Sequence, residues 1–423
     1  MRTVLTGIAV CLLSAAALAA QIELVHPSRL GFDAQRLERL PAAMHAMVDR
    51  GELSGIVTLV ARDRRVVHFQ AYGRQDLESG APMALDTIFR IYSMTKPVTG
   101  VAMMMLYEQG KWHPNDPIAR HIPEFANLKV FAGTNPDGSL QLVDPAHAPT
   151  MGELMSHTAG FTYGLFGDTP VDKLYREDNP LGKPNLQAFI ERMAQLPLLY
   201  QPGTRWVYSV SVDIQGYLVE KLSGQSLPEF MADNIFRPLG MVDTAFNVPE
   251  GKLGRLATVY AYHPTDGLAP RPRDANVTAV PGLASGGGGL YSTAHDYFRF
   301  AQMLAGRGEV DEIRILAPAT VDLMRANHLS DELLGGGFGI GWQRMRPGFG
   351  FGYDVAVFTD PHAVGSTTGQ GTYLWDGAAG TWFWIDPTND VVFIGMIQRL
   401  AGQGVVNIQS LSRQLVHQAL VTP

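Results

Sequence analysis

The chain has 423 residues, which is long enough to bury one large core or two smaller ones and excludes a small single-motif module. Hydrophobic residues make up 46% and charged residues 17% of the chain, a balance typical of globular proteins that excludes a largely disordered one. The formal net charge is −7 and no candidate helix face carries a run of Lys or Arg, so we expect no nucleic-acid partner.

The N-terminus predicts an export signal. Arg2 precedes an apolar stretch over residues 4–13, and the small residues that follow include the cleavage pattern Ala17-Leu18-Ala19. About ten apolar residues are too few to span a bilayer, and no later apolar run is long enough, so we expect no membrane span in the mature chain. We therefore expect residues 1–19 to be a signal peptide and the protein to be periplasmic or secreted. The single cysteine, Cys11, lies in this segment, so the mature chain has no disulfide and no cysteine metal ligand.

The first elements after the signal are a helix and a hairpin. Residues 33–50 place Leu37, Leu40, Met44 and Met47 three and four apart, which predicts an amphipathic helix. β-Branched and aromatic residues over 56–61 and 66–72, joined by the polar turn 62–65, predict two paired strands.

The middle of the chain is helical in character, and the end returns to strands. We predict helices over 98–108, 186–196, 212–222 and 227–236, with a surface excursion over 133–149 that holds at most a small hairpin. An amphipathic helix over 294–304 precedes strands over 339–345, 372–375, 381–385 and 391–397, and a helix over 405–420. The pattern indicates a discontinuous sheet domain (20–96 and 285–423) with a mainly helical domain (97–284) inserted into it.

The tetrapeptide Ser93-Met-Thr-Lys96 is a candidate nucleophile and base. Positions i and i+3 share one helix face, so the lysine can remove the serine proton if burial lowers its pKa. On these four letters alone, an N-cap serine beside a solvated lysine is the better interpretation. Two further turns change that balance: residues 201–213 place Tyr208 just before an apolar helix, and residues 154–161 contain His157-Thr-Ala-Gly160. A third stretch, 373–381, puts small residues beside a predicted strand.

Taken in this order, the stretches resemble the serine β-lactamase and penicillin-binding-protein-like superfamily, most closely its class C and family VIII carboxylesterase branches. The resemblance covers almost the whole mature chain, and six motifs in the family's order make it specific. It implies an α+β fold, in which an antiparallel sheet is flanked by helices and an all-helical domain is inserted beside it.

The same resemblance implies roles for individual residues. Ser93 would be the acylated nucleophile, Lys96 the group that takes its proton, and Tyr208 a second base that protonates the leaving group and later activates water. The backbone N–H groups of Ser93 and of Ala378, just after Gly377, would bind the oxyanion. The aromatic side chains that could line an apolar acyl pocket are Tyr92, Phe161 and Trp206, although single aromatics are more often core residues. For His157 we expect a structural role.

Departures from the family pattern bear on the substrate. The second motif of β-lactamases and peptidases ends in Asn, where this chain has Val210, which cannot hydrogen-bond a substrate amide. Their third motif is Lys-Thr-Gly, where this chain has Trp375-Asp376-Gly377. An ionised Asp376 in the pocket would repel a substrate carboxylate. The alternative is that Asp376 points to solvent and Trp375 packs in the core.

We therefore expect a serine hydrolase that acts on small-molecule carboxylic esters of small to medium acyl chain. A β-lactamase, a D-amino-acid-type peptidase or a transacylase on the same machinery is the alternative, and a non-catalytic binding module on this scaffold is a third interpretation that the intact Ser, Lys and Tyr disfavour. No H-E-x-x-H motif or similar His, Asp and Glu spacing occurs, so we expect no metal and no cofactor. The absence of G-x-S-x-G excludes an α/β-hydrolase elbow.

Overall fold

The computed structural model describes residues 22–335, 339–340, 343–400 and 407–422. The predicted signal peptide, residues 1–19, lies outside the described residues, and so does the beginning of the helix predicted over 405–420.

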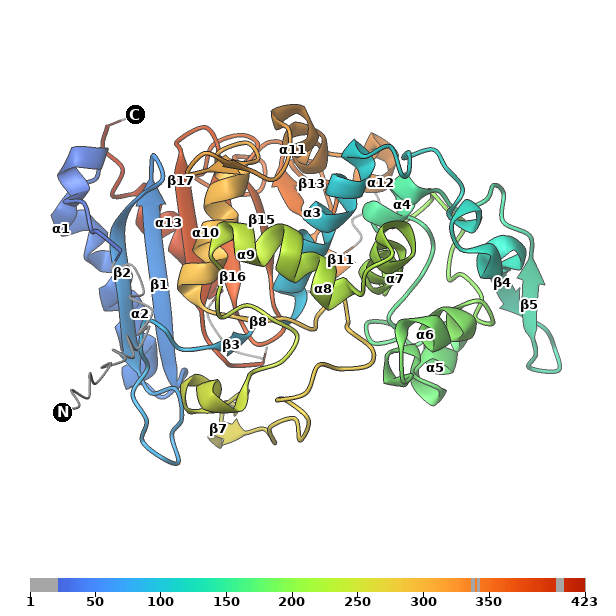
Figure 1. Ribbon diagram of the computed structural model, residues 1–423, viewed down its shortest axis with the longest axis horizontal. Helices are drawn as coiled ribbons and strands as arrows, with labels where there is room; N and C mark the ends of the chain where they lie inside the picture. The colour runs from blue at the N-terminus through green and yellow to red at the C-terminus, as the bar shows by residue number, and fades with distance from the viewer. Residues whose placement is uncertain (1–21, 336–338, 341–342, 401–406, 423) are drawn as a thin grey trace, which may run out of the picture.

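Both ends of the chain contribute strands to one sheet, in which every neighbouring pair is antiparallel (Figure 1). In spatial order its strands are β13 (Phe349–Phe351), β14 (Ala356–Phe358), β15 (Tyr373–Asp376), β16 (Trp382–Asp386), β17 (Val391–Met396), β1 (Gly55–Arg62) and β2 (Arg65–Gly73). The N-terminal hairpin therefore lies beside the last strand of the chain. This confirms the predicted antiparallel sheet flanked by helices.

Helices cover both faces of the sheet. The terminal helices α1 (Ala34–Leu37), α2 (Arg39–Asp49) and α13 (Ile408–His417) lie on one face, and α10 (Ala294–Ala305) packs on the other. Successive side chains of strand β16 contact the helices of opposite faces. Trp382 and Trp384 donate to Ser412 of α13, whereas the Phe383 ring lies 5.2 Å from that of Tyr297 on α10. Because successive side chains of a strand point to opposite faces, β16 is buried on both.

The remaining helices lie around the long helix α3 (Thr95–Glu108) and to its right in Figure 1, and α3 packs against α7. They are α4 (Met151–Met155), α5 (Pro170–Glu177), α6 (Leu186–Met193), α7 (Ser211–Ser223), α8 (Leu227–Met231) and α9 (Arg237–Leu239), with α11 (Pro318–Arg325) and α12 (Asp331–Gly335) later in the chain. Short two-stranded sheets are β3 (Phe89–Arg90) with β8 (Tyr291–Ser292), β4 (Val130–Thr134) with β5 (Leu140–Val143), β6 (Tyr260–His263) with β7 (Gly267–Pro270), β9 (Glu309–Val310) with β10 (Ile313–Arg314), and β11 (Gly339–Ile340) with β12 (Gln343–Arg344). Most buried side chains belong to one continuous core that extends from the sheet into the helical part.

Two predicted elements differ in detail from the structure. The strand predicted over 339–345 is a pair of two-residue strands, β11 and β12, that bond to each other instead of joining the large sheet. The helix predicted over 227–236 ends at Met231 and continues as a single π turn over Ala232–Phe236. Periodicity alone does not register such a local change of hydrogen bonding.

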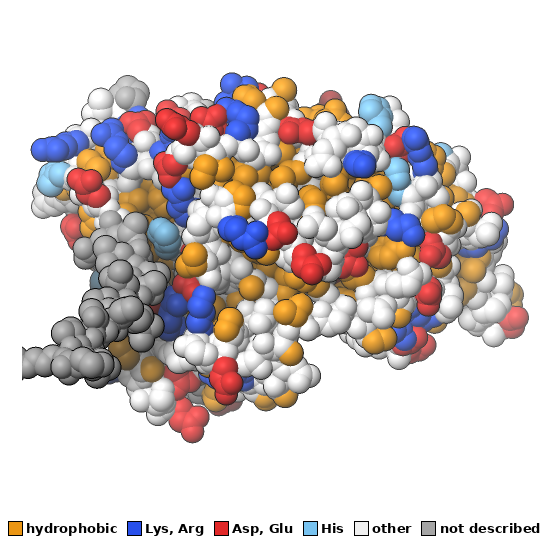
Figure 2. Space-filling view, viewed as in Figure 1, with side chains coloured by type: hydrophobic (Ala, Val, Ile, Leu, Met, Phe, Trp, Pro, Cys, Tyr) orange, Lys and Arg blue, Asp and Glu red, His pale blue; other side chains and the backbone are white. Residues whose placement is uncertain are grey.

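Charged groups are interspersed on the molecular face in Figure 2, where acidic and basic side chains alternate instead of gathering by sign. Among the described helices, none combines the length and the apolar character needed to cross a bilayer.

Candidate active site

The segment that carries Ser93 is held in an unusual backbone conformation. Strand β3 leads into a 3₁₀ turn over Tyr92–Met94, and α3 follows at once. Tyr92 has a φ of 44°, in the left-handed region that costs a non-glycine residue roughly 1–3 kcal/mol. Strain of this kind persists only where its surroundings impose it, and here it turns the chain directly before Ser93 at the start of a helix.

Lys96 lies one turn further on and is completely buried. Its Nζ donates to the carbonyl of Gly287 at 2.7 Å and to Ser93 Oγ at 3.3 Å. Burial lowers the pKa of Lys96 to about 8, against the opposing effect of nearby carboxylates, of which Asp213 is the largest. When the amine is neutral, its bond to Gly287 leaves the lone pair able to accept the serine proton. The predicted pair therefore meets, with the base near its working range.

Asp213 was not among the predicted site residues. It lies in the first turn of α7 and is fully buried, where Oδ1 accepts from Ser285 Oγ at 2.5 Å and from the Gly287 N–H at 3.0 Å. Burial raises the pKa of this carboxyl, and the charge of Lys96 opposes the rise. Asp213 thus holds the glycine tract whose carbonyl binds Lys96. An acidic residue among the apolar residues at the start of α7 was the available signal.

Asp354 is a second buried carboxyl near Lys96. Its Oδ1 accepts from Gln215 Nε2 at 3.1 Å, while Oδ2 has no hydrogen-bond partner among the described residues. Burial raises the pKa of Asp354 well above its usual range. Asp354 raises the pKa of Lys96, as Asp213 does, but its effect is the smaller of the two. No sequence pattern distinguished it.

Tyr208 completes the predicted group. Lys96 Nζ lies 4.5 Å from the centroid of its ring, and only 9% of the tyrosine is exposed. Burial raises the pKa of the phenol well above its usual value, while the side chains of Ser93 and Trp375 oppose the rise. The phenol is therefore protonated at neutral pH and can donate its proton to a leaving group. Ser93, Lys96 and Tyr208 converge in the structure.

The turn around His157 supports the tyrosine. His157 has a φ of 59°, its carbonyl accepts from the Val207 N–H at 2.9 Å, and Nδ1 lies 3.1 Å from Ser209 Oγ. Burial lowers the pKa of His157 well below its usual value, and the charge of Lys96 lowers it further. His157 thus bonds to the residues on both sides of Tyr208, to Val207 through its backbone carbonyl and to Ser209 through its imidazole, in agreement with a structural role.

One of the two predicted oxyanion donors, Ala378, lies just after the end of β15. A Cβ on Gly377 would lie 2.2 Å from the carbonyl oxygen of Ile91, so only glycine lets this end of β15 approach the segment before Ser93. The next residue, Ala378, is exposed, and its N–H makes no hydrogen bond within the described part of the chain. An N–H in that position can bind a developing oxyanion.

The side chains of Trp375 and Asp376 point to opposite faces of the sheet. Trp375 is 1% exposed, and its ring centroid lies 5.4 Å from that of Tyr208. Because neighbouring strand residues face opposite ways, Asp376 turns toward α13, where its Oδ2 accepts from Gln409 Nε2 at 2.6 Å. Its charge also acts on the guanidinium of Arg413, whose pKa burial lowers to about 10. The repulsion expected between Asp376 and a substrate carboxylate is thus reduced, because α13 engages the aspartate.

In the described part of the chain, one cavity is lined by Tyr208 and another by Tyr92, the residue before Ser93. The first has a volume of about 150 Å³ and borders Tyr208, with Trp206 and Phe166 also in its wall. The second has a volume of about 340 Å³ and is lined by Tyr92 together with arginine side chains. Phe161 instead packs in the core, 1% exposed, with its ring 5.7 Å from that of Phe125. Phe161 thus takes the core position that was the favoured interpretation for a single aromatic, while Tyr92 and Trp206 line different cavities.

Within the described ranges, no group of three or more His, Cys, Asp or Glu side chains is arranged as metal ligands would be.

Comparisons with known proteins agree with this geometry. The model of the Beta-lactamase family matches residues 40–416. Protein Rv1367c of Mycobacterium tuberculosis is 36% identical over 84% of this chain and 88% of its own length, and Esterase EstB of Burkholderia gladioli is 31% identical over 84% and 89%. Among solved structures, EstCE1, a hydrolase with promiscuous acyltransferase activity, superposes with a TM-score of 0.76 at 27% identity over 90% of this chain and 99% of its own. Simvastatin synthase (LovD) from Aspergillus terreus shares the fold, with a TM-score of 0.75 at 22% identity over 92% and 98%.

Proposed function

The chain belongs to the Beta-lactamase family, and from that membership we propose that it is a serine hydrolase that cleaves carboxylic esters of small to medium acyl chain through an acyl-enzyme on Ser93. One observation carries the proposal: a fully buried Lys96 amine, with a pKa of about 8, lies 3.3 Å from the Ser93 hydroxyl. A lysine in that state is a base for a serine that would otherwise be a weak nucleophile.

The acylation step follows from these positions. Ser93 Oγ attacks the ester carbonyl as its proton passes to Lys96, and the N–H groups of Ser93 and Ala378 bind the oxyanion. The C–O bond of the ester then breaks, and Tyr208 gives its proton to the departing alkoxide. The positive charge on Lys96, 4.5 Å from the Tyr208 ring centroid, stabilises the phenolate until a proton returns from the lysine. In deacylation, water attacks the acyl carbonyl, its proton passes through the same groups, and Ser93 recovers its hydroxyl.

Two residues favour esters over β-lactams and peptides: Trp375, which stands where the family has a lysine, and Val210, which stands where it has an asparagine. Trp375 occupies the position of the family's lysine and packs against Tyr208 and Phe351, so no cation there meets a substrate carboxylate. Val210 is 1% exposed and offers no side-chain hydrogen bond. Relatives that carry esterase names support the same choice: Esterase EstB, and the Lovastatin esterase of Penicillium rubens at 29% identity.

We also propose export. The support is the sequence of residues 1–19, with its charged start, apolar stretch and Ala17-Leu18-Ala19. The intact mass of protein recovered from a periplasmic fraction should correspond to a chain that begins near Ala20. A full-length chain confined to the cytoplasm would contradict the proposal.

The activity is tested with 4-nitrophenyl butyrate on the purified protein. We expect a burst of 4-nitrophenol equal to the enzyme concentration, followed by slower turnover, and loss of both in Ser93→Ala. Full turnover by the Ser93→Ala variant would show that the nucleophile is another group. Nitrocefin and a D-Ala-D-Ala peptide, assayed on the same sample, should be cleaved far more slowly than the ester; the reverse order would identify the alternative function.

A further inference from the structure

The cavity beside Tyr92 is the larger of the two, and Tyr92 in its wall is the residue before the nucleophile. Tyr92 immediately precedes Ser93, and Arg90 pairs with Tyr291 in the β3–β8 ladder. The cavity wall consists of Arg90, Tyr92, Leu256, Ala257, Thr258, Val259, Arg271, Pro272, Arg273, Asp274, Val277, Tyr291 and Leu400. A volume of about 340 Å³ is within the usual range of small-molecule sites.

Positive charge predominates in this wall. It contains the guanidinium groups of Arg90, Arg271 and Arg273, and its acidic member is Asp274. Among the described residues, none of the three arginines forms an ion pair, and the Arg90 Nε is buried without a hydrogen-bond partner. Asp76 lies near enough to Arg273 for that charge to lower its pKa, but hydrogen bonds from Ser79 and Thr258 lower it more.

The Arg90 side chain is oriented by its neighbours. Its guanidinium carbon lies 4.6 Å from the centroid of the Tyr92 ring and 5.9 Å from that of Tyr291. The backbone of Arg90 is bound on both sides by Gln398, which accepts from its N–H and donates to its carbonyl, each at 3.1 Å. A cation stacked on aromatic rings, with an unpaired N–H group, is suited to bind an oxyanion.

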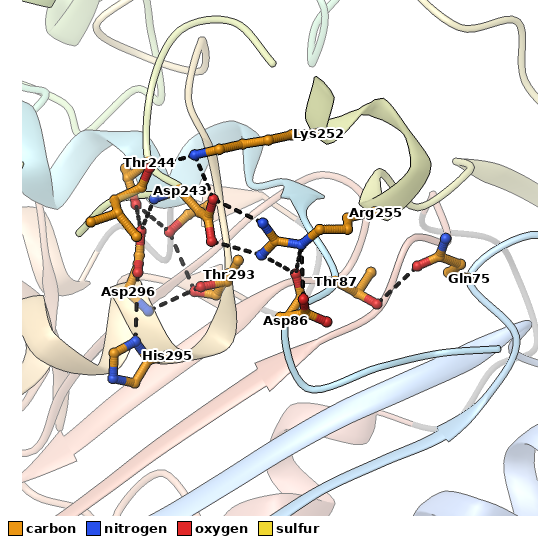
Figure 3. Close-up of polar contacts among 12 residues, drawn as sticks. Gln75, Asp86, Thr87, Asp243, Thr244, Lys252, Arg255, Thr293, His295 and Asp296 are labelled. Atoms are coloured by element: carbon orange, nitrogen blue, oxygen red, sulfur yellow. Dashed lines mark hydrogen bonds and ion pairs between the residues drawn. The ribbon is translucent and has the colours of Figure 1, made fainter. Parts of the chain in front are cut away.

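The part of the cavity wall that begins at Leu256 is also held in place by the rest of the protein. Figure 3 shows the guanidinium of Arg255, the residue before Leu256, held between Asp243 and Asp86. The next residues are tied to the core by backbone bonds, from Ala257 N–H to the carbonyl of Ile88 at 2.9 Å and from Thr258 N–H to that of Gln75 at 2.9 Å. Binding then requires little reorganisation of this wall, which favours affinity.

Because Tyr208 is the proposed donor to the leaving alcohol, the alcohol part of an ester faces the cavity that borders Tyr208. The acyl part is then assigned to the larger cavity, whose wall includes Tyr92, the residue before Ser93. We infer that the cationic cavity binds a carboxylate at the far end of the acyl part, so that the preferred substrates are monoesters of dicarboxylic acids. This inference rests on the proposed function and specifies its substrate class. Guanidinium groups recognise carboxylates through paired, charge-assisted hydrogen bonds, which a carboxamide does not reproduce.

The test compares mono-4-nitrophenyl adipate with the 4-nitrophenyl ester of adipic acid monoamide, which has nearly the same shape without the charge. We expect kcat/KM to be about tenfold or more higher for the carboxylate at low ionic strength, and the advantage to shrink as salt is added. In the double variant Arg271→Gln/Arg273→Gln, both residues being exposed, and in Arg90→Gln, the ratio should fall toward one.

Arg65→Gln is the matched control, since it removes one exposed positive charge from the β1–β2 hairpin and should retain the wild-type ratio. A wild-type ratio of one or less, or a ratio that the cavity variants leave intact, would overturn the inference. A second pair, the butyrate esters of 4-hydroxybenzoate and 4-hydroxybenzamide, puts the charge on the alcohol; a preference confined to that pair would overturn the assignment to the acyl part.

A binding measurement distinguishes a failure of this inference from a failure of the proposed function. Calorimetric titration of the Ser93→Ala variant with the two adipate esters measures the cavity without turnover. Tighter binding of the carboxylate supports the cavity even if neither ester is hydrolysed by the wild-type protein, an outcome that would contradict the proposed function alone. Equal binding of the two esters would contradict the inference while leaving hydrolysis of the neutral ester unaffected.

Discussion

The cavity beside Tyr208 and the cavity beside Tyr92 differ in size and in charge. The one beside Tyr208, of about 150 Å³, has aromatic and aliphatic residues in its wall and Asp172 as its charged member. The one beside Tyr92, of about 340 Å³, has three arginines and Asp274. Both are separate from the buried group of Lys96, Asp213 and Asp354, which sets the reactivity of the serine. In this molecule, then, the residues that make the nucleophile and the residues that select the substrate are different sets.

That separation predicts that a catalytic substitution reduces the turnover of every ester by the same factor. Lys96→Met keeps the buried volume but removes the base, and a general base contributes roughly 10²- to 10⁴-fold. We expect kcat to fall about 10³-fold with both the adipate monoester and its carboxamide, while circular dichroism shows an intact fold. If the loss were confined to the charged ester, the lysine would act as part of the cationic cavity and the comparison would fail.

The pH dependence of kcat/KM tests whether Lys96 acts as the base. The lysine must be neutral to accept a proton, and its pKa is about 8. The neutral fraction therefore rises about fiftyfold between pH 6 and pH 8 and levels off above pH 9. We expect kcat/KM for the neutral ester to follow this curve. A rate that falls as the pH rises through 8 would show that the charged amine is the active form.

Two buried carboxyls allow a matched test of this curve. Ionised Asp213 raises the pKa of Lys96, so Asp213→Asn should move the inflection to lower pH, with a moderate loss of rate because the glycine tract loses an acceptor. Asp354 also raises the pKa of Lys96, but less than Asp213 does, so Asp354→Asn should move the inflection in the same direction by a smaller amount. A larger shift in Asp354→Asn than in Asp213→Asn would contradict this order.

Much of the sheet could be predicted from the sequence because strands with β-branched and aromatic residues are visible in single windows. The catalytic trio has no sufficient local signature: Ser93 and Lys96 alone favoured a helix cap, and the roles of the trio came from the order of several motifs that together resemble one family. The three-residue strands β13 and β14 were missed because they are too short to show a period. Asp213 and Asp354 reach Lys96 only through tertiary packing, and so does the arginine set of the larger cavity, which draws residues from 90, 271 and 273. Asp376 was placed in the pocket because a motif position does not reveal which face of a strand its side chain takes.

The smallest effect concerns the cavity beside Tyr208. Phe166 is 55% exposed, and its ring centroid lies 5.8 Å from that of Tyr208, so Phe166→Ala should remove apolar contact without unfolding the protein. Partial burial of such a ring against an aromatic alcohol is worth about 1 kcal/mol, or about a fivefold change. We expect the ratio of kcat/KM for 1-naphthyl butyrate to that for ethyl butyrate to fall by this factor, while the adipate ratio of the other cavity stays unchanged. Leu165→Ala, at the neighbouring residue, which is 68% exposed, is the control and should alter neither ratio. A change in the adipate ratio upon Phe166→Ala would show that the two cavities are one continuous site.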